Sequence, residues 1–303
     1  MRIEWSAVPE AIRAGTEDIL GSRVVSATTQ FGGFSHGLAA RLTLQDESRL
    51  FMKAIPGDEW LAKFYRNEAA TCAVLPAEAP APRLKFTANI QGWCIVGFDD
   101  VEGHHPRLDV EKELAGTLAA LEKAAQVLTP SPIADAPSMR DTHEPDFQGW
   151  RSLAENPVDD LDDWSLRHLD RLAESESTWQ KFADGDTLLH CDVRPDNLLV
   201  KSDGSVVMVD WAWACQGAAW IDLGMFAPYL ADSGVDPDPV LAAHPLTRGI
   251  APDAVSSLVI ALAGYWTLSC RKPALPQAPA LRAHQKRCAQ VTLGWLQRRL
   301  NWT

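Results

Sequence analysis

The sequence lacks the features typical of membrane, secreted and nucleic-acid-binding proteins. No segment of its 303 residues approaches the run of about 18 apolar residues that a membrane-spanning helix needs. The N-terminal segment has no apolar stretch of the signal-peptide kind. The net charge of −12 argues against the basic surface that binds nucleic acid. We therefore expect a cytoplasmic protein with no membrane or nucleic-acid partner.

Cysteine is scarce, and its spacing shows no pattern of pairing. The chain has no Cys-x-x-Cys pair and no zinc-type spacing among its six cysteines, at positions 72, 94, 191, 215, 270 and 288. We expect these thiols to be reduced. The hydrophobic content of 46% and the 12 Trp instead indicate an ordered globular chain. Its length allows one large domain or two lobes of about 100 and 200 residues.

Oxygen-rich side chains gather between Leu188 and Trp211. Two short apolar segments here are joined by Ser202-Asp203-Gly204, which predicts a β-hairpin. Its geometry would bring Asp192, Asn197 and Asp210 near one point. An aspartate there can accept a hydroxyl proton, while an amide and a second carboxylate can hold Mg²⁺ against nucleotide phosphates.

The same stretch resembles the aminoglycoside phosphotransferase family, the small-molecule branch of the protein-kinase-like fold. The resemblance lies in His190-Cys191-Asp192, in Asn197 five residues after the aspartate, and in Val209-Asp210-Trp211. The family pattern has glycine where this chain has Cys191. A loop of solvated polar residues is the alternative interpretation, but two such motifs in order, each after a strand-like run, argue against it.

The resemblance implies a role for each residue of the motif. Asp192 would align and deprotonate the acceptor hydroxyl, and His190 would brace the loop. Arg194 is a further candidate that would add positive charge near the transferred group. Asn197 and Asp210 would be the Mg²⁺ ligands, with ATP or GTP as co-substrate.

The N-terminal half supplies candidates for holding the nucleotide. Residues 23–30, 38–44 and 49–55 are predicted strands, and a glycine-rich turn with Gly32, Gly33 and Ser35 joins the first two. Backbone N–H groups of such a turn can approach phosphate oxygens. Taken alone, a glycine-rich hairpin is weak evidence for phosphate binding.

A lysine inside an apolar strand needs a partner for its charge. Lys53 is such a lysine, although snorkelling at a strand edge is the alternative. In the resembled family this lysine bridges the nucleotide phosphates and a glutamate of the next helix. We predict that helix over 60–75 and favour Glu68 as the partner over Glu59, which would sit at the helix start.

The fold class predicted from this order is α+β, a bilobal protein-kinase-like fold. Residues 84–87 and 93–98 would complete a five-stranded antiparallel sheet with one main helix, and Phe98, Asp99 and Val101 would line the adenine pocket at the hinge. We place a nucleotide-binding lobe at residues 1–100. A helical lobe with the catalytic loop and substrate site would span 101–303.

The helical half carries the remaining expectations. The resemblance implies that Asp222 accepts hydrogen bonds from the catalytic-loop backbone, a role compatible with that of a helix N-cap. Residues 129–145 would be a long loop. Residues 163–183 have helical periodicity. Apolar residues of the helix predicted over 253–270 are assigned to the core: Val255, Leu258, Val259, Leu262 and Trp266.

The acceptor is the least determined part of the function. Acidic residues concentrated over 141–186 would either solvate the surface or attract a cationic substrate. Those of 141–163, with loop acids of 222–238, are candidate ligands for the ammonium groups of an aminoglycoside-like antibiotic. Ring stacking is the other possibility, with five candidates: Trp150, Trp164, Trp211, Trp213 and Trp220.

Three functions stay open at this point. A kinase that phosphorylates an antibiotic, aminoglycoside-like or another natural product, comes first. A metabolic kinase of another small alcohol, sugar or nucleoside comes second. The third is a nucleotide-binding regulatory pseudokinase, against which the intact Asp192 argues. A monomer and a homodimer are equally compatible with the sequence.

Overall fold

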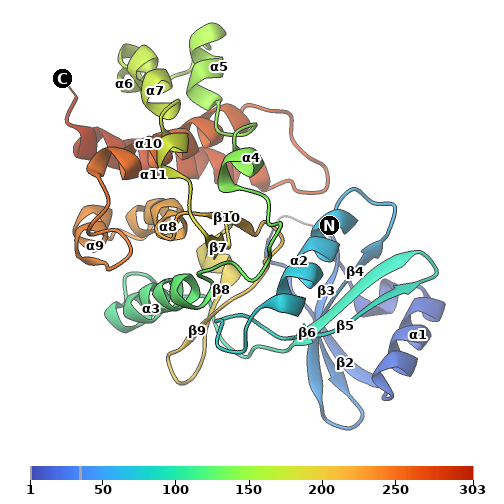
Figure 1. The fold of residues 1–303 in the computed structure, drawn as a ribbon. Helices are drawn as coiled ribbons and strands as arrows, with labels where there is room; N and C mark the ends of the chain where they lie inside the picture. The colour runs from blue at the N-terminus through green and yellow to red at the C-terminus, as the bar shows by residue number, and fades with distance from the viewer. Residues whose placement is uncertain (1, 34–35, 303) are drawn as a thin grey trace.

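The N-terminal part of the chain is a β-sheet with a helix on each face (Figure 1). The structure, a computed structural model, describes residues 2–33 and 36–302. The sheet has six strands in the order β1-β3-β4-β6-β5, with β2 also paired to β3. These strands are β1 (Arg2–Ile3), β2 (Val24–Thr29), β3 (Gly37–Leu44), β4 (Arg49–Pro56), β5 (Leu84–Ile90) and β6 (Trp93–Asp99).

The α+β class is confirmed, but the predicted strand count was one too low. The missed strand, β1, is two residues long and pairs with β3 in parallel, whereas the other neighbouring strands of this sheet are antiparallel. A two-residue strand is too short to show the alternation on which strand prediction depends. β6 ends at Asp99, and the division of the chain near residue 100 stays a prediction.

Alternation along β4 decides which side chains face the site. Leu50, Met52 and Ala54 pack in a cluster with Ile12 of α1 (Glu10–Leu20). Successive strand residues point to opposite faces. Lys53 therefore lies on the other face, which α2 (Ala62–Val74) covers.

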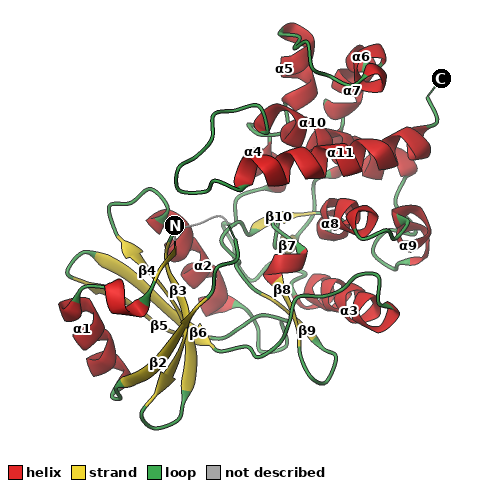
Figure 2. Cartoon of the chain, turned by 180° about the vertical axis from the view of Figure 1, so that it is seen from behind, coloured by secondary structure: helices red, strands yellow, loops and turns green. Residues whose placement is uncertain are grey.

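The C-terminal part is mainly helical and contains two small two-stranded sheets (Figure 2). β7 (Thr187–Leu189) pairs with β10 (Cys215–Gly217), and β8 (Leu198–Val200) forms the predicted hairpin with β9 (Val206–Met208). The helices are α3 (Glu111–Val127), α4 (Met139–His143), α5 (Gly149–Glu155), α6 (Asp163–Arg167), α7 (Leu169–Glu176), α8 (Ile221–Asp232), α9 (Pro237–Ala243), α10 (Pro252–Ser269) and α11 (Leu281–Leu300). Short 3₁₀ turns lie at Trp5–Ala7, Trp179–Phe182 and Pro195–Asn197.

One loop prediction was wrong, and one segment predicted to be helical has an internal break, each for a local reason. Residues 129–145 contain α4, which begins where the Ser138 side chain accepts a hydrogen bond from the Asp141 N–H. The segment 163–183 is divided into α6, α7 and a 3₁₀ turn, with a break at His168. Caps and breaks of this kind determine short helices more than apolar periodicity does.

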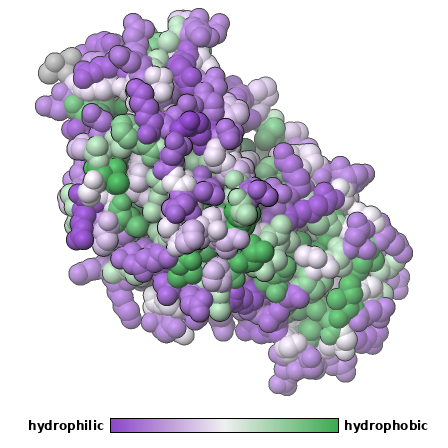
Figure 3. Space-filling model, in the orientation of Figure 1, coloured by the Kyte–Doolittle hydropathy of each residue, from purple (hydrophilic) through white to green (hydrophobic). Residues whose placement is uncertain are grey.

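On the side shown in Figure 3, apolar residues form small groups among mainly hydrophilic ones. Within residues 2–33 and 36–302, no helix has the length and apolar character needed to cross a membrane.

A buried carboxylate ties α5 to α7. Glu176 accepts hydrogen bonds from the backbone N–H groups of Trp150 and Arg151, at 2.9 and 3.0 Å, and from the Arg151 side chain at 3.2 Å. Glu176→Ala would leave these donors without their partner, so we expect it to lower the free energy of unfolding by about 3 kcal/mol. The exposed Glu174→Ala is the control. Urea denaturation measures both, and equal effects would contradict this account.

Candidate active site

The loop after β7 is held in place by the first turn of α8. Asp222 accepts hydrogen bonds from the backbone N–H groups of His190 (2.8 Å) and Cys191 (2.9 Å), as predicted. Cys191 has φ +61°, in the left-handed region that glycine adopts without strain. The residue in the family's glycine position therefore keeps a backbone conformation that favours glycine.

His190 is fully buried and connects two loops of the site. Its Nδ1 accepts the backbone N–H of Asp192 at 3.2 Å, so the ring proton lies on Nε2, which donates to the carbonyl of Val209 at 2.9 Å. Both ring nitrogens are thus engaged with backbone groups. This geometry suits a bracing residue better than a proton-transfer residue.

Asp192 lies between an arginine and an amide. Its Oδ1 is 3.5 Å from the Arg194 guanidinium, and its Oδ2 accepts a hydrogen bond from Asn197 Nδ2 at 3.0 Å. Burial raises the pKa of Asp192, although the charge of Arg194 opposes that effect. A carboxylate with a raised pKa and a partly exposed side chain has the properties of a general base.

Lys53 of β4 contacts two carboxylates, one on α2 and one in the segment after the β8–β9 hairpin. Its Nζ lies 2.7 Å from Glu68 Oε2 and 3.0 Å from Asp210 Oδ1. The partner is Glu68, as predicted, whereas Glu59 pairs with His36 at 3.4 Å. Three elements far apart in sequence thus contribute to one charged cluster.

Burial and neighbouring charges have different effects on the pKa values of the three ionisable groups in this cluster. Burial disfavours the charge on Lys53, but the two carboxylates raise the pKa of its ammonium and keep it protonated. Burial raises the pKa of Glu68 to about 7, against the effect of Lys53. Burial also disfavours the charge on Asp210, but Lys53 lowers the pKa of that carboxyl, so Asp210 stays ionised.

Asn197 and Asp210 offer oxygen atoms of the kind that Mg²⁺ prefers. The Val209 N–H donates to the Asn197 carbonyl at 2.9 Å, which brings the two loops together. Asn197 donates through Nδ2 to Asp192, so its Oδ1 is the atom it can offer to a cation. One amide oxygen and one ionised carboxylate fit the hard-donor requirement of Mg²⁺, which completes its shell with phosphate and water oxygens.

The predicted phosphate-binding turn lies beside α2. Gly32 and Gly33 precede β3, and the carbonyl of Gly32 accepts a hydrogen bond from Arg2 at 3.4 Å. Tyr65 of α2 donates to the His36 carbonyl at 2.9 Å. Ser35, the third predicted residue of the turn, lies outside the described residues.

The three predicted base-contacting residues surround the end of β6. Phe98 is buried, Asp99 pairs with Lys85 at 2.6 Å, and the carbonyl of Val101 accepts a hydrogen bond from Arg41. The Asp99 carboxylate and the Val101 carbonyl therefore already have protein partners. Their contact with a nucleotide base stays a prediction.

A cavity of about 560 Å³ opens directly from the catalytic loop. Cys191, Asp192, Arg194 and Asp210 form part of its wall. Aromatic rings dominate the rest: Trp60, Phe64, Tyr65, Phe147, Trp213, Tyr229, Tyr265 and Trp266. Asp192 thus faces a large and mostly apolar space.

Most of this wall was missed by sequence reasoning. Leu262 and Trp266 are buried as predicted, yet they also line the cavity. Of the five tryptophans considered for ring stacking, only Trp213 lies on the cavity wall. The sequence signal for these residues is the helical spacing of apolar side chains. That spacing is the same for residues of a core and for residues that line a pocket.

The acids predicted to bind a cationic substrate lie mostly outside the wall of this cavity. Among the acids of 141–163, only Asp146 lines the cavity, and none of the loop acids after Asp222 does. Asp160 is instead paired with Arg271 at 2.9 Å, and Asp141 lies in the cap of α4. These acids therefore serve helix ends and surface pairs.

Solved structures with a similar fold include small-molecule kinases. Choline kinase LicA from Streptococcus pneumoniae superposes with a TM-score of 0.62 at 12% identity, covering 93% of this chain and 98% of that one. A thermostable mutant of aminoglycoside phosphotransferase APH(4)-Ia, in ternary complex with AMP-PNP and hygromycin B, gives 0.60 at 14% identity, covering 94% and 98%. Macrolide 2′-phosphotransferase type I gives 0.59 at 17% identity, covering 95% and 98%. The fold is therefore that of the protein-kinase-like phosphotransferases.

The sequence places the chain within this class. A model of the phosphotransferase enzyme family (APH) matches residues 30–254, and the chain belongs to that family. It is a small-molecule kinase, an enzyme that transfers a phosphoryl group to a hydroxyl, and the family resemblance is confirmed. No curated protein matches the sequence.

Proposed function

We propose that this enzyme phosphorylates a hydroxyl of a bulky and predominantly apolar natural product, an antibiotic of macrolide-like character, with ATP or GTP as donor. The observation that carries the proposal is the aromatic cavity that opens from Asp192. The proposed reaction uses two parts of the site, called here the donor half and the acceptor half. The donor half would bind the nucleotide, and the acceptor half would bind the molecule that is phosphorylated.

The donor half is the cluster around Lys53. The ammonium of Lys53, held by Glu68, would orient the nucleotide phosphates. Asn197 and Asp210 would hold Mg²⁺, which offsets negative charge on the phosphates when bound. Positive charge concentrated at the transferred phosphoryl group favours the transition state of phosphoryl transfer.

Asp192 connects the two halves. Its carboxylate faces the cavity, and the hydrogen bond from Asn197 fixes its orientation. An acceptor hydroxyl in the cavity would donate to this carboxylate and lose its proton as the bond to phosphorus forms. The guanidinium of Arg194 lies on the same wall and would counter the charge of the transferred group.

The charges of the cavity wall favour an apolar acceptor over a polycationic one. Asp146 is the one carboxylate on the wall outside the catalytic group, among the residues that the structure describes. An aminoglycoside would bring several ammonium groups, and burying a charge without a partner is costly. Aromatic walls instead favour contact with flat or ring-shaped apolar surfaces. The macrolide kinase of the same fold is consistent with such an acceptor.

The test is nucleotide consumption with Mg²⁺ and a panel of macrolides, aminoglycosides, choline and sugars. Trp213 is 41% exposed and lines the cavity, and its ring contacts that of Phe64 in a tilted arrangement with centroids 4.6 Å apart. We expect Trp213→Ala to raise KM for the apolar acceptor about tenfold, with little change in kcat.

The control variant is Leu166→Ala, which shortens an exposed apolar side chain away from the cavity. Its KM should equal that of the wild type. Turnover of aminoglycosides with none of macrolides would contradict the acceptor class but leave the kinase intact. Failure to bind any nucleotide would contradict the donor half.

A further inference from the structure

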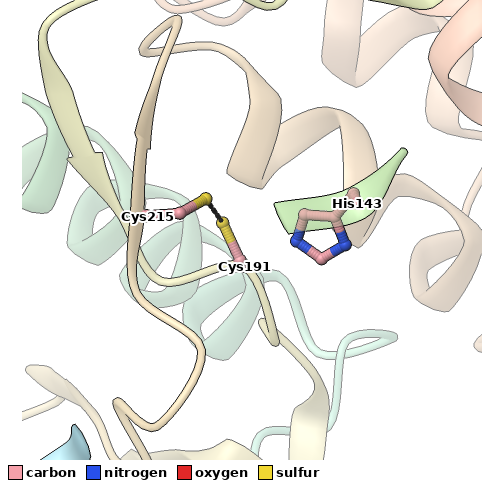
Figure 4. A group of neighbouring side chains, drawn as sticks. All are labelled: His143, Cys191 and Cys215. Atoms are coloured by element: carbon pink, nitrogen blue, oxygen red, sulfur yellow. Dashed lines mark hydrogen bonds between the residues drawn. The ribbon is translucent and has the colours of Figure 1, made fainter. Parts of the chain in front are cut away.

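Soft donor atoms cluster beneath the catalytic loop (Figure 4). Cys191 belongs to that loop, Cys215 to β10, and His143 to α4; one donor atom from each lies within 4.8 Å of the others. The two sulfurs are 2.7 Å apart. Met139, also of α4, places its thioether sulfur 3.9 Å from Cys191 Sγ and 3.8 Å from Cys215 Sγ.

The histidine of this cluster is buried without a full set of partners. His143 is 8% exposed, and its Nε2 has no hydrogen-bond partner among the residues that the structure describes. Burial lowers the pKa of His143 to about 4, so the ring is neutral and keeps a lone pair. A buried nitrogen without a partner costs free energy. Apolar packing alone does not explain it.

We propose that Cys191, Cys215 and His143 bind a thiophilic divalent cation of the zinc type. Thiolate and imidazole are the ligands that such ions prefer, and Met139 offers a weak fourth donor. On binding, each thiol would release its proton to solvent and donate an electron pair as thiolate, while the imidazole would use its lone pair. Cys191 and His143 line the cavity, which gives the ion a path of entry.

The sulfur atoms of Cys191 and Cys215 lie closer together than two zinc ligands do. Zinc–sulfur bonds of about 2.3 Å in a tetrahedral site place two sulfurs about 3.7 Å apart. The two sulfurs would have to separate by about 1 Å from their present 2.7 Å. The thioether sulfur of Met139 already lies close to the tetrahedral spacing of about 3.7 Å from each of the two cysteine sulfurs, at 3.9 and 3.8 Å. Rotation about the Cα–Cβ bonds of the two cysteines would be the movement that separates them.

A metal ion bound at this site would affect the neighbouring residue Asp192. Residue 191 lies between His190 and Asp192, so an ion would tie the catalytic loop to α4 and β10. We expect the displacement of Cys191 to move Asp192 and to inhibit phosphoryl transfer, a consequence that rests on the proposed function. Binding itself does not depend on that function.

The experiment is a titration of the reduced full-length protein with Co²⁺, followed by competition with Zn²⁺. Two thiolates and an imidazole should give sulfur-to-cobalt charge-transfer bands and intense visible bands, both lost when zinc displaces cobalt. Cys215→Ser and His143→Gln should each weaken Co²⁺ binding at least tenfold. Cys270→Ser, which removes a half-buried thiol elsewhere, should bind as the wild type does.

Three results would overturn the proposal. Equal cobalt spectra and affinities in Cys215→Ser and the wild type would mean adventitious binding only. A thiol count two lower than the six of the sequence, in protein isolated without reductant and before any metal is added, would mean that Cys191 and Cys215 form a disulfide instead. Cys191→Gly should fold, because glycine suits φ +61°, and it should also lose the bands. Retention of the bands in that variant would likewise contradict the assignment.

Discussion

Asp192→Asn is expected to lower kcat about a thousandfold and to leave nucleotide affinity within about twofold. Asparagine has nearly the same volume and keeps an oxygen for the hydrogen bond from Asn197. It lacks a basic carboxylate, so the acceptor hydroxyl would keep its proton. The measurements are steady-state turnover with the best acceptor and nucleotide binding by calorimetry.

The matched control is Asp203→Asn, at the exposed tip of the β8–β9 hairpin. Its turnover should be unchanged. In the wild type, kcat/KM should fall as the pH falls, because protonated Asp192 cannot accept a proton. The midpoint of that decline should lie above the ordinary value of 3.8, since burial raises the pKa of Asp192. Substantial turnover in Asp192→Asn would show that proton transfer does not depend on this group.

The donor half of the site could be predicted because its residues are fixed by short-range patterns. Lys53 stands alone in an apolar strand, and Glu68 lies within the next helix, so alternation and helical spacing point both side chains into one layer. Asp192 and Asn197 are five residues apart on one loop. Asp210 follows directly from β9, whose register with β8 is set by a short hairpin turn. Each of these patterns spans at most fifteen residues of sequence, although the contact of Lys53 with Asp210 joins distant segments.

The acceptor half could not be predicted in the same way. Tyr229, Leu262 and Tyr265 belong to α8 and α10, and they line the cavity only because of how those helices pack. Their spacing along each helix is also that of core residues. Whether an apolar stripe is covered or left facing a cavity depends on the position of another helix, which the sequence does not display.

The sulfur cluster was missed for a related reason. Cys191 and Cys215 are 24 residues apart, so they form no short-range motif. They meet because β7 and β10 pair antiparallel with Cys215 opposite Leu189, two residues before Cys191. Sheet register, rather than cysteine spacing, creates this contact.

The second large effect concerns the metal. Asp210→Asn should lower nucleotide affinity in the presence of Mg²⁺ about a hundredfold, which is about 2.7 kcal/mol. Asparagine offers a neutral oxygen in place of the ionised carboxylate that Lys53 stabilises. The fold should persist, because Lys53 keeps Glu68 at 2.7 Å.

The decisive measurement is nucleotide affinity with and without Mg²⁺, compared between variants. In the wild type Mg²⁺ should tighten binding strongly, whereas in Asp210→Asn the two affinities should nearly coincide. Asp196→Asn is a matched control from the same region, because Asp196 pairs with Arg194 at 2.9 Å instead of with Lys53. It should keep the full dependence on Mg²⁺. If Asp210→Asn kept that dependence as well, the cation would have to be held by other oxygens, and the assignment of Asp210 as a metal ligand would fail.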